Sequence, residues 1–246
     1  MNAHDPSVAS RENWLLGMLP EEARLRIIGQ CETISVPIKA IIVEPEMTLD
    51  YAYFPLSGCL SVVSLMENGG SVEVGTIGWE GMFGLSLLHG ITSISQQCIA
   101  QVPGDMRRIR VDALLNELGH HAELRAVLNR YAEVWINQVS RGGSCNSVHP
   151  IEQRCARWLL LTHDRVESDL LPLTQEFLAI MLGVRRASVT SAAASLQKRG
   201  AISYKHGKIT VLDRAGLEAA SCVCYGLMQQ MYQKQLSDGS SESPNS

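Results

Sequence analysis

The spacing of apolar residues changes once along the chain, near Val111, and this change limits the possible folds more than any other feature. From Cys31 to Arg110, short apolar runs rich in Val, Ile and Tyr alternate with Pro, Gly and the pair Asn68-Gly69. Such runs predict strands, and Asn-Gly favours a tight hairpin turn. Beyond Val111, apolar residues recur at helical spacing. The sequence therefore predicts an α+β chain with an N-terminal antiparallel β-barrel followed by helices.

The stretch 111–140 predicts one long amphipathic helix. Its apolar stripe has steps of four and three residues, as in a coiled-coil seam, and consists of Leu124, Leu128, Tyr131 and Trp135. We interpret this stripe as a dimer interface, with packing against the chain's own barrel as the alternative. Gly142 and Gly143 then predict the end of the helix and a hinge, because paired glycines are unfavourable inside a helix.

Shorter helices are expected on either side of these regions. Residues 10–30 look like short helical pieces, one of them opened by Pro20. A further helix follows Pro150, and a last one is predicted from about Arg214 to Leu236. The tail at 237–246 has too few apolar residues to fold.

The charge is distributed unevenly along the chain. The formal net charge is −4, yet seven basic residues stand against two acidic ones between Thr174 and Arg214. A basic segment on an acidic body is typical of a protein in which one part meets phosphates. The net charge alone would have argued against a nucleic-acid partner.

The same basic segment has the pattern of two short helices joined by a tight turn. Thr174 is a good N-cap for the run QEFLAIML, and Gly183 ends that run. A second helix begins at Arg185 or Arg186 and places its apolar residues on one face, namely Val189, Ala193 and Leu196. Its other face is basic and rich in hydroxyl groups. This pattern predicts a helix-turn-helix.

Two short strands about His206-Gly207 follow and predict a wing that carries Lys205 and Lys208. The alternative to a winged helix-turn-helix is an ordinary helical hairpin followed by a hairpin of strands, with lysines that are merely solvated. At the level of function, the alternative is a small-molecule-binding or redox-sensing scaffold whose C-terminal module mediates protein contacts.

The run LPLTQEFLAIMLGVRRASVTSAAASLQKRGAISYKHGKITVLD resembles the DNA-binding domain of the Crp/Fnr transcription regulators. Weaker matches in the barrel are YFPLSG and GWEGMFGL, and the likeness extends over about residues 12–225. The resemblance implies a barrel of the cyclic-nucleotide-binding type, a dimerisation helix and a winged helix-turn-helix. It also implies a cytoplasmic homodimer that has double-stranded DNA and RNA polymerase as partners.

On this basis the expected organisation has five parts. They are a sensor barrel at 12–118, a dimerisation helix at 119–141, a hinge at 142–149, a winged helix-turn-helix at 150–225 and a disordered tail at 237–246.

The resemblance also implies roles for residues in the basic segment. Arg186 lies where the family arginine reads a guanine, whereas Ala187 replaces a family glutamate that accepts a hydrogen bond from cytosine. We therefore expect a different half-site. The full predicted DNA-binding set is Arg185, Arg186, Ser188, Ser191, Thr174, Gln175, Lys205, His206 and Lys208.

The barrel departs from the nucleotide-binding members of the family. Those members carry an acid for the ribose and an arginine for the cyclic phosphate, where this chain has Met82 and Gln96. Neither residue can replace a charge-assisted hydrogen bond, so cyclic AMP is not the expected effector. The predicted effector pocket comprises Gly81, Met82, Gly84, Gln96 and Gln97.

The seven cysteines are scattered through a chain without an export signal, so reduced thiols are expected. Cys222 and Cys224 would point about 200° apart on one helix, which predicts buried thiols rather than a metal site. Cys145 and Cys155 are interpreted in the same way. The N-terminal cysteine cluster of the iron–sulfur branch is lacking, because only Cys31 precedes residue 59.

We expect no cofactor and no metal. The sequence has no nucleophile-base pair, phosphate loop or HExxH pattern, so an enzyme is not expected. It also lacks an apolar run long enough to span a membrane, so we expect no membrane association.

Overall fold

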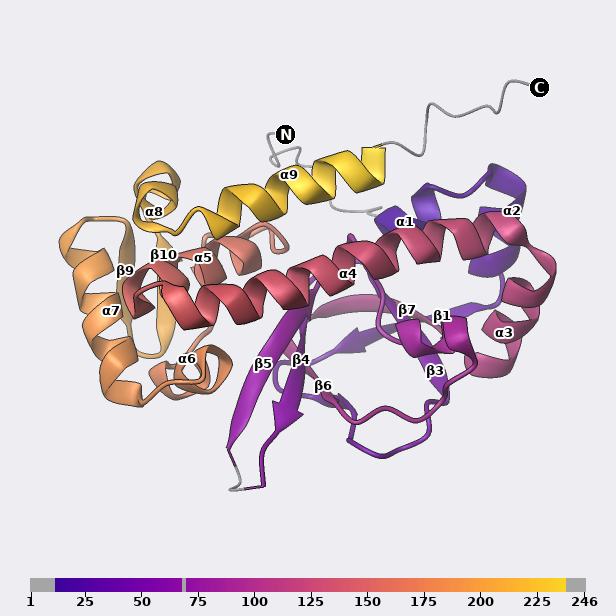
Figure 1. Cartoon of the computed structure of the whole chain (residues 1–246), viewed down its shortest axis with the longest axis horizontal. Coiled ribbons are helices and arrows are strands. Elements are labelled where there is room, and N and C mark those ends of the chain that lie inside the picture. The colour runs from indigo at the N-terminus through magenta and orange to yellow at the C-terminus, as the bar shows by residue number, and fades with distance from the viewer. Residues whose placement is uncertain (1–11, 68–69, 238–246) are drawn as a thin grey trace.

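The computed structural model describes residues 12–67 and 70–237, so the predicted Asn68-Gly69 turn and most of the predicted tail lie outside the described residues. Figure 1 shows a sheet-rich body beside a smaller domain of helices and short strands, with a long helix running past both. The two short N-terminal helices are α1 (Trp14–Gly17) and α2 (Glu21–Ile28), and Pro20 directly precedes α2, which it was predicted to open.

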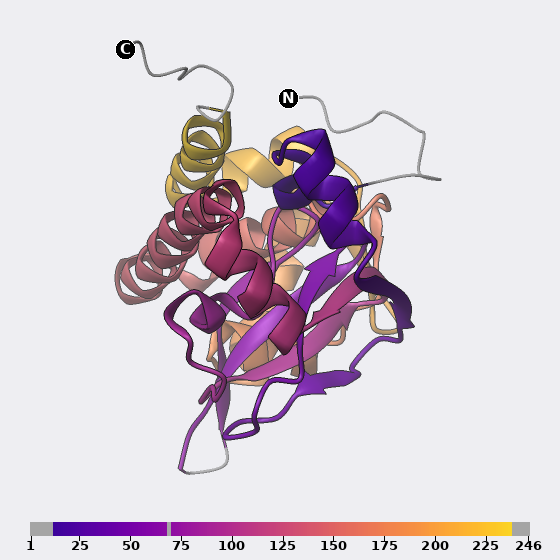
Figure 2. The same cartoon turned by 90° about the vertical axis from the view of Figure 1, so that its right-hand side faces the viewer.

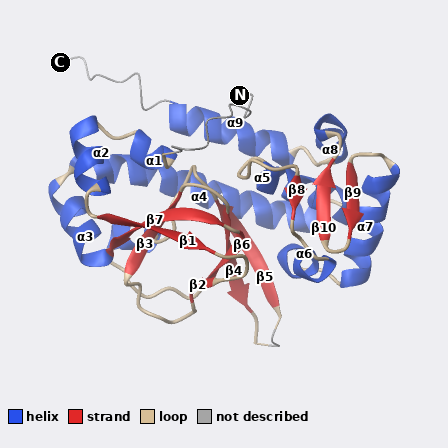
Figure 3. Cartoon of the chain, turned by 180° about the vertical axis from the view of Figure 1, so that it is seen from behind, coloured by secondary structure: helices blue, strands red, loops and turns tan. Residues whose placement is uncertain are grey.

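The strands of the N-terminal domain form two antiparallel sheets, as the short apolar runs predicted. Their bounds are β1 (Cys31–Val36), β2 (Ile41–Val43), β3 (Tyr51–Pro55), β4 (Cys59–Leu65), β5 (Ser71–Ile77), β6 (Gln97–Val102) and β7 (Gly104–Arg110). One sheet has the order β1-β7-β3 and the other β2-β6-β4-β5. Both contribute side chains to one apolar core, for example Phe54 and Leu60. Figure 3 shows the strands of both sheets in red. The sheets remain separate in strand pairing, so the barrel is not closed.

The predicted helix 111–140 is two helices, α3 (Val111–His120) and α4 (Ala122–Val148). The chain turns at His121, whose backbone is extended with φ −126° and ψ 100°. A 3-10 helix, η2 (Leu85–His89), lies earlier in the chain and contacts both.

The predicted stop and hinge at Gly142 and Gly143 are wrong, because α4 continues through both glycines to Val148. The helix ends instead before Pro150, since a proline pushes the preceding residue, here His149 with φ −101° and ψ 143°, out of the helical region.

The seam predicted for dimerisation is buried in the chain's own core. Leu124, Leu128 and Tyr131 are each at most 1% exposed and pack beneath the sheets, and Trp135 packs against the same core. The prediction of a dimer interface there is wrong. The alternative of packing against the barrel describes these residues correctly, because the sheets need an apolar cover and α4 is the cover.

The C-terminal domain has a second core. Its elements are α5 (Ile151–His163), β8 (Leu170–Leu171), α6 (Gln175–Leu182), α7 (Arg186–Lys198), β9 (Ile202–Lys205), β10 (Lys208–Val211) and α8 (Arg214–Ala220). The small sheet has the order β8-β10-β9. Leu159, Leu178 and Leu196 are fully buried at the centre of this core.

The last helix, predicted as one helix from about Arg214 to Leu236, is two helices in the structure. α8 ends at Ala220, Ser221 is extended, and a new helix α9 (Cys224–Ser237) begins after Val223. α9 runs back along α4, and the two lie side by side in Figures 1 and 2. Among the described residues no single helix is long and apolar enough to cross a membrane; only α6 and α7, a strongly bent pair, have such length and composition together.

Buried polar contacts join the two domains. Glu73 on β5 accepts hydrogen bonds from Ser61 on β4 (2.6 Å) and from the Trp158 indole on α5 (2.7 Å). Arg165, just after α5, pairs with Glu80 at 2.7 Å with both side chains at most 7% exposed. The orientation of the C-terminal domain is therefore held by specific hydrogen bonds as well as by apolar packing.

Candidate nucleic-acid interface

The two helices α6 and α7 have the geometry of a helix-turn-helix. The Thr174 hydroxyl accepts a hydrogen bond from the Phe177 amide (3.1 Å) and so caps α6, as predicted. Gly183 ends α6 in the left-handed conformation with φ 62°, where a side chain would cause strain. The chain bends by 107° between the helices, within the 90–120° typical of this motif.

The two faces of α7 divide as the sequence predicts. Val189, Ala193 and Leu196 are at most 2% exposed and pack into the domain core. The opposite face is exposed and carries Arg186 and Ser191, while Ser188 is half-buried at its edge. The exposed face is polar and lined by small side chains, which allows close approach to another molecule.

The N-terminus of α7 carries two arginines where helix electrostatics favours acids. Arg185 is the N-cap and Arg186 the first helical residue; both are exposed, and the first turn holds no acidic residue. The side chain of the N-cap residue Arg185 makes no hydrogen bond to the amide groups at this end. Positive side chains beside the positive end of the helix dipole repel it slightly, which an anion placed there would relieve. The two arginines at this helix end therefore slightly destabilise the isolated chain. They would interact favourably with a phosphate or with the electron-rich edge of a base.

The predicted wing is a two-residue hairpin beside the start of α6. Lys205 and Lys208 pair across β9 and β10, and His206 and Gly207 between them have φ 50° and 73°. Two positive φ angles fit a type I′ turn. A Cβ on Gly207 would lie 3.3 Å from the Thr174 methyl group, so the wing tip and the N-terminus of α6 are neighbours.

Five of the seven basic residues in this segment are exposed and make no ion pair within the described part of the chain: Arg185, Arg186, Lys198, Lys205 and Lys208. The other two basic residues form ion pairs within the chain. Arg199 pairs with Glu152 at 3.0 Å, and Arg214 pairs with Asp164 and Glu218. Charges left unpaired on one surface are available to an anionic partner.

Sequence reasoning missed Thr190 on the exposed face of α7. Its hydroxyl lies 2.9 Å from Oε1 of the half-buried Gln175 and 3.0 Å from the Arg186 carbonyl oxygen. It therefore orients Gln175, which was predicted only as a backbone contact. The spacing of four residues from Arg186 could have pointed to it, because residues i and i+4 share a helix face.

A pocket of about 260 Å³ lies between strands β4 and β5, the segment that leads into η2, and α4. Met82, Gly84 and Gln96 line it as predicted, together with Trp135 and Val139 of α4. Its lining, taken from the described residues, holds no lysine or arginine. The pocket is thus mostly apolar, and α4 forms one of its walls.

Two residues predicted for this pocket lie elsewhere. Gly81 faces Tyr131, since a Cβ there would lie 2.0 Å from the Tyr131 hydroxyl oxygen, and Gln97 donates a hydrogen bond to Glu44 (2.6 Å). Neither residue is therefore part of the lining of this pocket.

The structure also brings together four residues with metal-ligating atoms, Cys145, His149, Cys222 and Cys224. The expectation that Cys222 and Cys224 diverge on one helix was wrong, because the chain is not helical at Cys222. Cys155 lies apart from them in the core of the C-terminal domain. The spacing of these residues in the sequence does not predict the group, because α4 and the loop between α8 and α9 are far apart along the chain.

Comparisons with known proteins agree with this architecture. The profile of the Crp-like helix-turn-helix domain family matches residues 153–220. No curated protein sequence matches the chain.

Solved structures share the fold at low sequence identity. FixK2 from Bradyrhizobium japonicum is 16% identical with a TM-score of 0.67, over 78% of this chain and 98% of that one. A transcriptional regulator of the Crp/Fnr family from Eubacterium rectale is 21% identical with a TM-score of 0.67, over 85% and 99%. The c-di-GMP responsive regulator CLP from Xanthomonas campestris is 14% identical with a TM-score of 0.63, over 78% and 99%.

Proposed function

We propose that this chain, which has the Crp/Fnr fold and a Crp-like helix-turn-helix domain at residues 153–220, is a dimeric transcription regulator that reads a two-fold symmetric DNA site. The observation that carries the proposal is the N-terminus of α7, where Arg185 and Arg186 are exposed and unpaired beside free helix amides. Neither arginine makes an ion pair with the residues that the structure describes, and the arrangement matches the chemistry of a DNA groove.

In this proposal the exposed face of α7 enters the major groove. Arg186 donates two hydrogen bonds to a guanine, and Ser191 contacts a base or a phosphate on the same face. Ala187 has no acceptor for a cytosine amino group, so the half-site differs from one read by a glutamate at this position. Thr174, Gln175 and the wing lysines contact the DNA backbone and set the orientation.

We propose that two copies meet through the outer face of α4 rather than through the buried seam. This face lies opposite the sheets, is not covered by α9, and has Ile136 at its middle with 57% exposure. Small or polar exposed side chains surround it at helical spacing, namely Ala122, Ala126, Asn129, Glu133, Ser140 and Ser144. Small residues let two helices approach closely, and a central exposed isoleucine can anchor the contact.

The effector we propose is a small, uncharged and largely apolar molecule in the pocket beside α4. A buried phosphate without a cationic partner would be costly, which disfavours cyclic nucleotides. Arg125 does not supply this charge, because its guanidinium donates to the carbonyl oxygens of Leu88 and Leu118. Titration calorimetry with cyclic AMP should show no heat of binding, and micromolar binding would contradict this part of the proposal.

A ligand there has a direct route to the DNA-binding domain. Val74 lines the pocket from β5, and Val72 on the same strand has methyl groups 3.3 Å from where a Cβ on Gly183 would lie. A shift of β5 would therefore reach the turn between α6 and α7. Contact with RNA polymerase and cytoplasmic localisation stay predictions from the sequence.

Selection from a randomised DNA duplex, read by mobility shift, tests the proposal. We expect a palindrome whose half-sites are about 10–10.5 base pairs apart, with affinity that falls steeply as salt rises. Recovery of no preferred sequence, or binding insensitive to salt, would favour the rival interpretation as a scaffold whose C-terminal module contacts proteins.

A further inference from the structure

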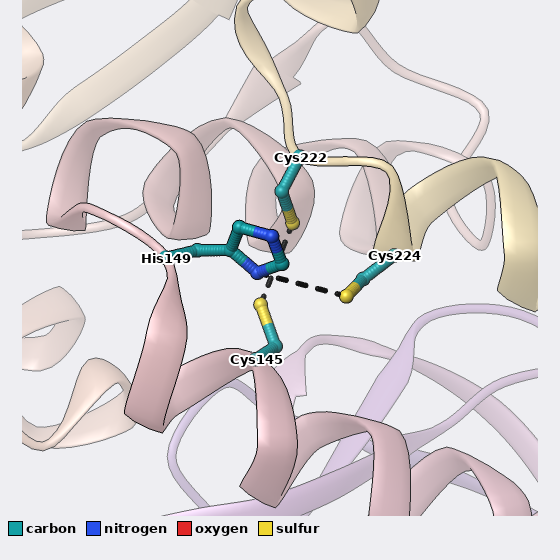
Figure 4. Close-up of side chains that lie close together, drawn as sticks. All are labelled: Cys145, His149, Cys222 and Cys224. Carbon is teal, nitrogen blue, oxygen red and sulfur yellow. Dashed lines mark hydrogen bonds between the residues drawn. The ribbon is translucent and has the colours of Figure 1, made fainter.

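Four side chains from two distant segments converge where the long helix ends. Cys145 and the C-cap residue His149 come from the last turn of α4, and Cys222 and Cys224 come from the loop after α8 and the first residue of α9 (Figure 4). All four ligand atoms lie within 4.8 Å of one another. The three cysteines are at most 4% exposed, and His149 is partly buried. The group is therefore enclosed by protein and has one side nearer to solvent.

The spacing fits the four corners of one tetrahedral metal site. Zinc binds cysteine sulfur at about 2.3 Å and histidine nitrogen at about 2.0–2.1 Å, which puts two sulfurs about 3.8 Å apart and a sulfur and a nitrogen about 3.6 Å apart. The Sγ atoms of Cys145 and Cys222 are 3.4 Å apart, and Cys224 Sγ is 3.7 Å from His149 Nδ1. An iron–sulfur cubane attaches its four ligands to four different irons, so its ligands lie further apart than these.

The charges around the group suit bound thiolates. Arg157 and Arg154 are at most 9% exposed and lie close enough to interact electrostatically with the cysteines. Neither makes an ion pair with a carboxylate within the described ranges, and the Arg157 Nε has no hydrogen-bond partner there. Three thiolates, one neutral histidine and Zn²⁺ carry a net charge of −1, which two buried guanidinium groups stabilise. Within the described ranges Arg157 also interacts with Glu73, whereas the acidic groups that interact with Arg154 are Cys145 and Cys222 of this group.

We propose that Cys145, His149, Cys222 and Cys224 form a structural Cys3His site for one zinc ion. All four tetrahedral positions are filled by protein, as in structural rather than catalytic zinc sites. The ion joins the end of α4 to the segment that leaves the DNA-binding domain. It thereby holds α9 along α4 and restrains the junction at Pro150, where the two domains meet in sequence.

The full-length protein, purified under reducing conditions without chelators, tests the site. We expect about one zinc per chain by elemental analysis, and X-ray absorption that reports three sulfurs and one nitrogen around it. Cys222→Ser and Cys224→Ser should each lose stoichiometric zinc. Cys155→Ser, which removes a buried thiol outside the group, should keep it. His149→Cys should also keep the ion, because it supplies a fourth thiolate.

A second measurement does not depend on how the variants fold. Wild-type protein stripped by a chelator is titrated with zinc in competition with a chromophoric chelator, and with Co²⁺, whose visible spectrum reports tetrahedral thiolate coordination. Zinc should also protect the three cysteines of the site from alkylation while leaving Cys31 as reactive as before. The proposal would be overturned if the reduced chain bound no zinc, if Cys155→Ser lost as much zinc as the site variants, or if the protein held iron with acid-labile sulfide.

Discussion

The helices α7 and α4 each carry an apolar stripe at helical spacing. Comparing them shows what such a stripe predicts about packing and about partners. Both stripes are buried inside their own chain: Val189 and Leu196 in α7 and Leu124 and Leu128 in α4 are at most 1% exposed. The difference lies on the opposite faces. α7 presents arginines and hydroxyl groups, whereas α4 presents small residues around Ile136. A stripe therefore identifies the buried side of a helix, and the opposite side carries the information about partners.

The first test of this comparison is to shorten a side chain in the buried stripe of α4. Leu128→Ala should lower the free energy of unfolding by about 2–5 kcal/mol, because it removes a fully buried side chain and leaves a cavity. Urea unfolding measures this loss. If Leu128 were a seam between subunits instead, the variant would form stable monomers with little change in the unfolding of each one.

The contact between the two domains gives a second test. Burial raises the pKa of Glu73 from 4.5 to about 7, although hydrogen bonds from Ser61 and Trp158 oppose the shift. Between these pH values the folded chain keeps a proton that the unfolded chain has released, so stability should fall as pH rises from about 4.5 to 7 and then level off.

Glu73→Gln removes this titration and can keep an acceptor for the Trp158 indole. At pH 8 it should be more stable than wild type by on the order of 2 kcal/mol, and at pH 4.5 about equal to it. Urea unfolding across this pH range is the measurement. Equal pH dependence in both proteins would show that Glu73 is ionised in the folded chain at no cost.

The smallest expected effect on folding belongs to the outer face of α4. Ile136→Glu should change the free energy of unfolding of the monomer by no more than about 0.5 kcal/mol, because the side chain is 57% exposed. It should nevertheless weaken dimerisation at least about tenfold, since two glutamates would face each other near the symmetry axis. Sedimentation measures the dimer, with Glu133→Gln as a control on the same face. An unchanged dimer would place the interface elsewhere.

Regions held by contacts between residues close in sequence could be predicted, whereas regions held by contacts between distant segments could not. The helix-turn-helix and wing were predictable because Thr174, Gly183 and the His206-Gly207 turn act on residues close to them in sequence. The partners of α4 could not be predicted in this way, because Leu128 packs beneath strands formed much earlier in the chain.

The cysteine group escaped prediction for a related reason. Its two halves lie at residues 145–149 and 222–224, and the break at Ser221 that turns Cys222 toward α4 has no strong local signal such as proline or glycine. The pocket was partly predicted, since Met82 and Gln96 came from the resemblance, whereas Trp135 depended on how α4 packs.

The most direct test of the central claim, that the exposed face of α7 reads DNA sequence, compares Arg186→Ala with Lys208→Ala on the selected site and on random duplex. Arg186→Ala should cost about 1–3 kcal/mol on the selected site and relax the preference at one base pair, while Lys208→Ala should weaken binding to all sequences alike. Equal losses on both duplexes for both variants would contradict the account, because Arg186 would then be a phosphate contact and the reading of bases would lie elsewhere.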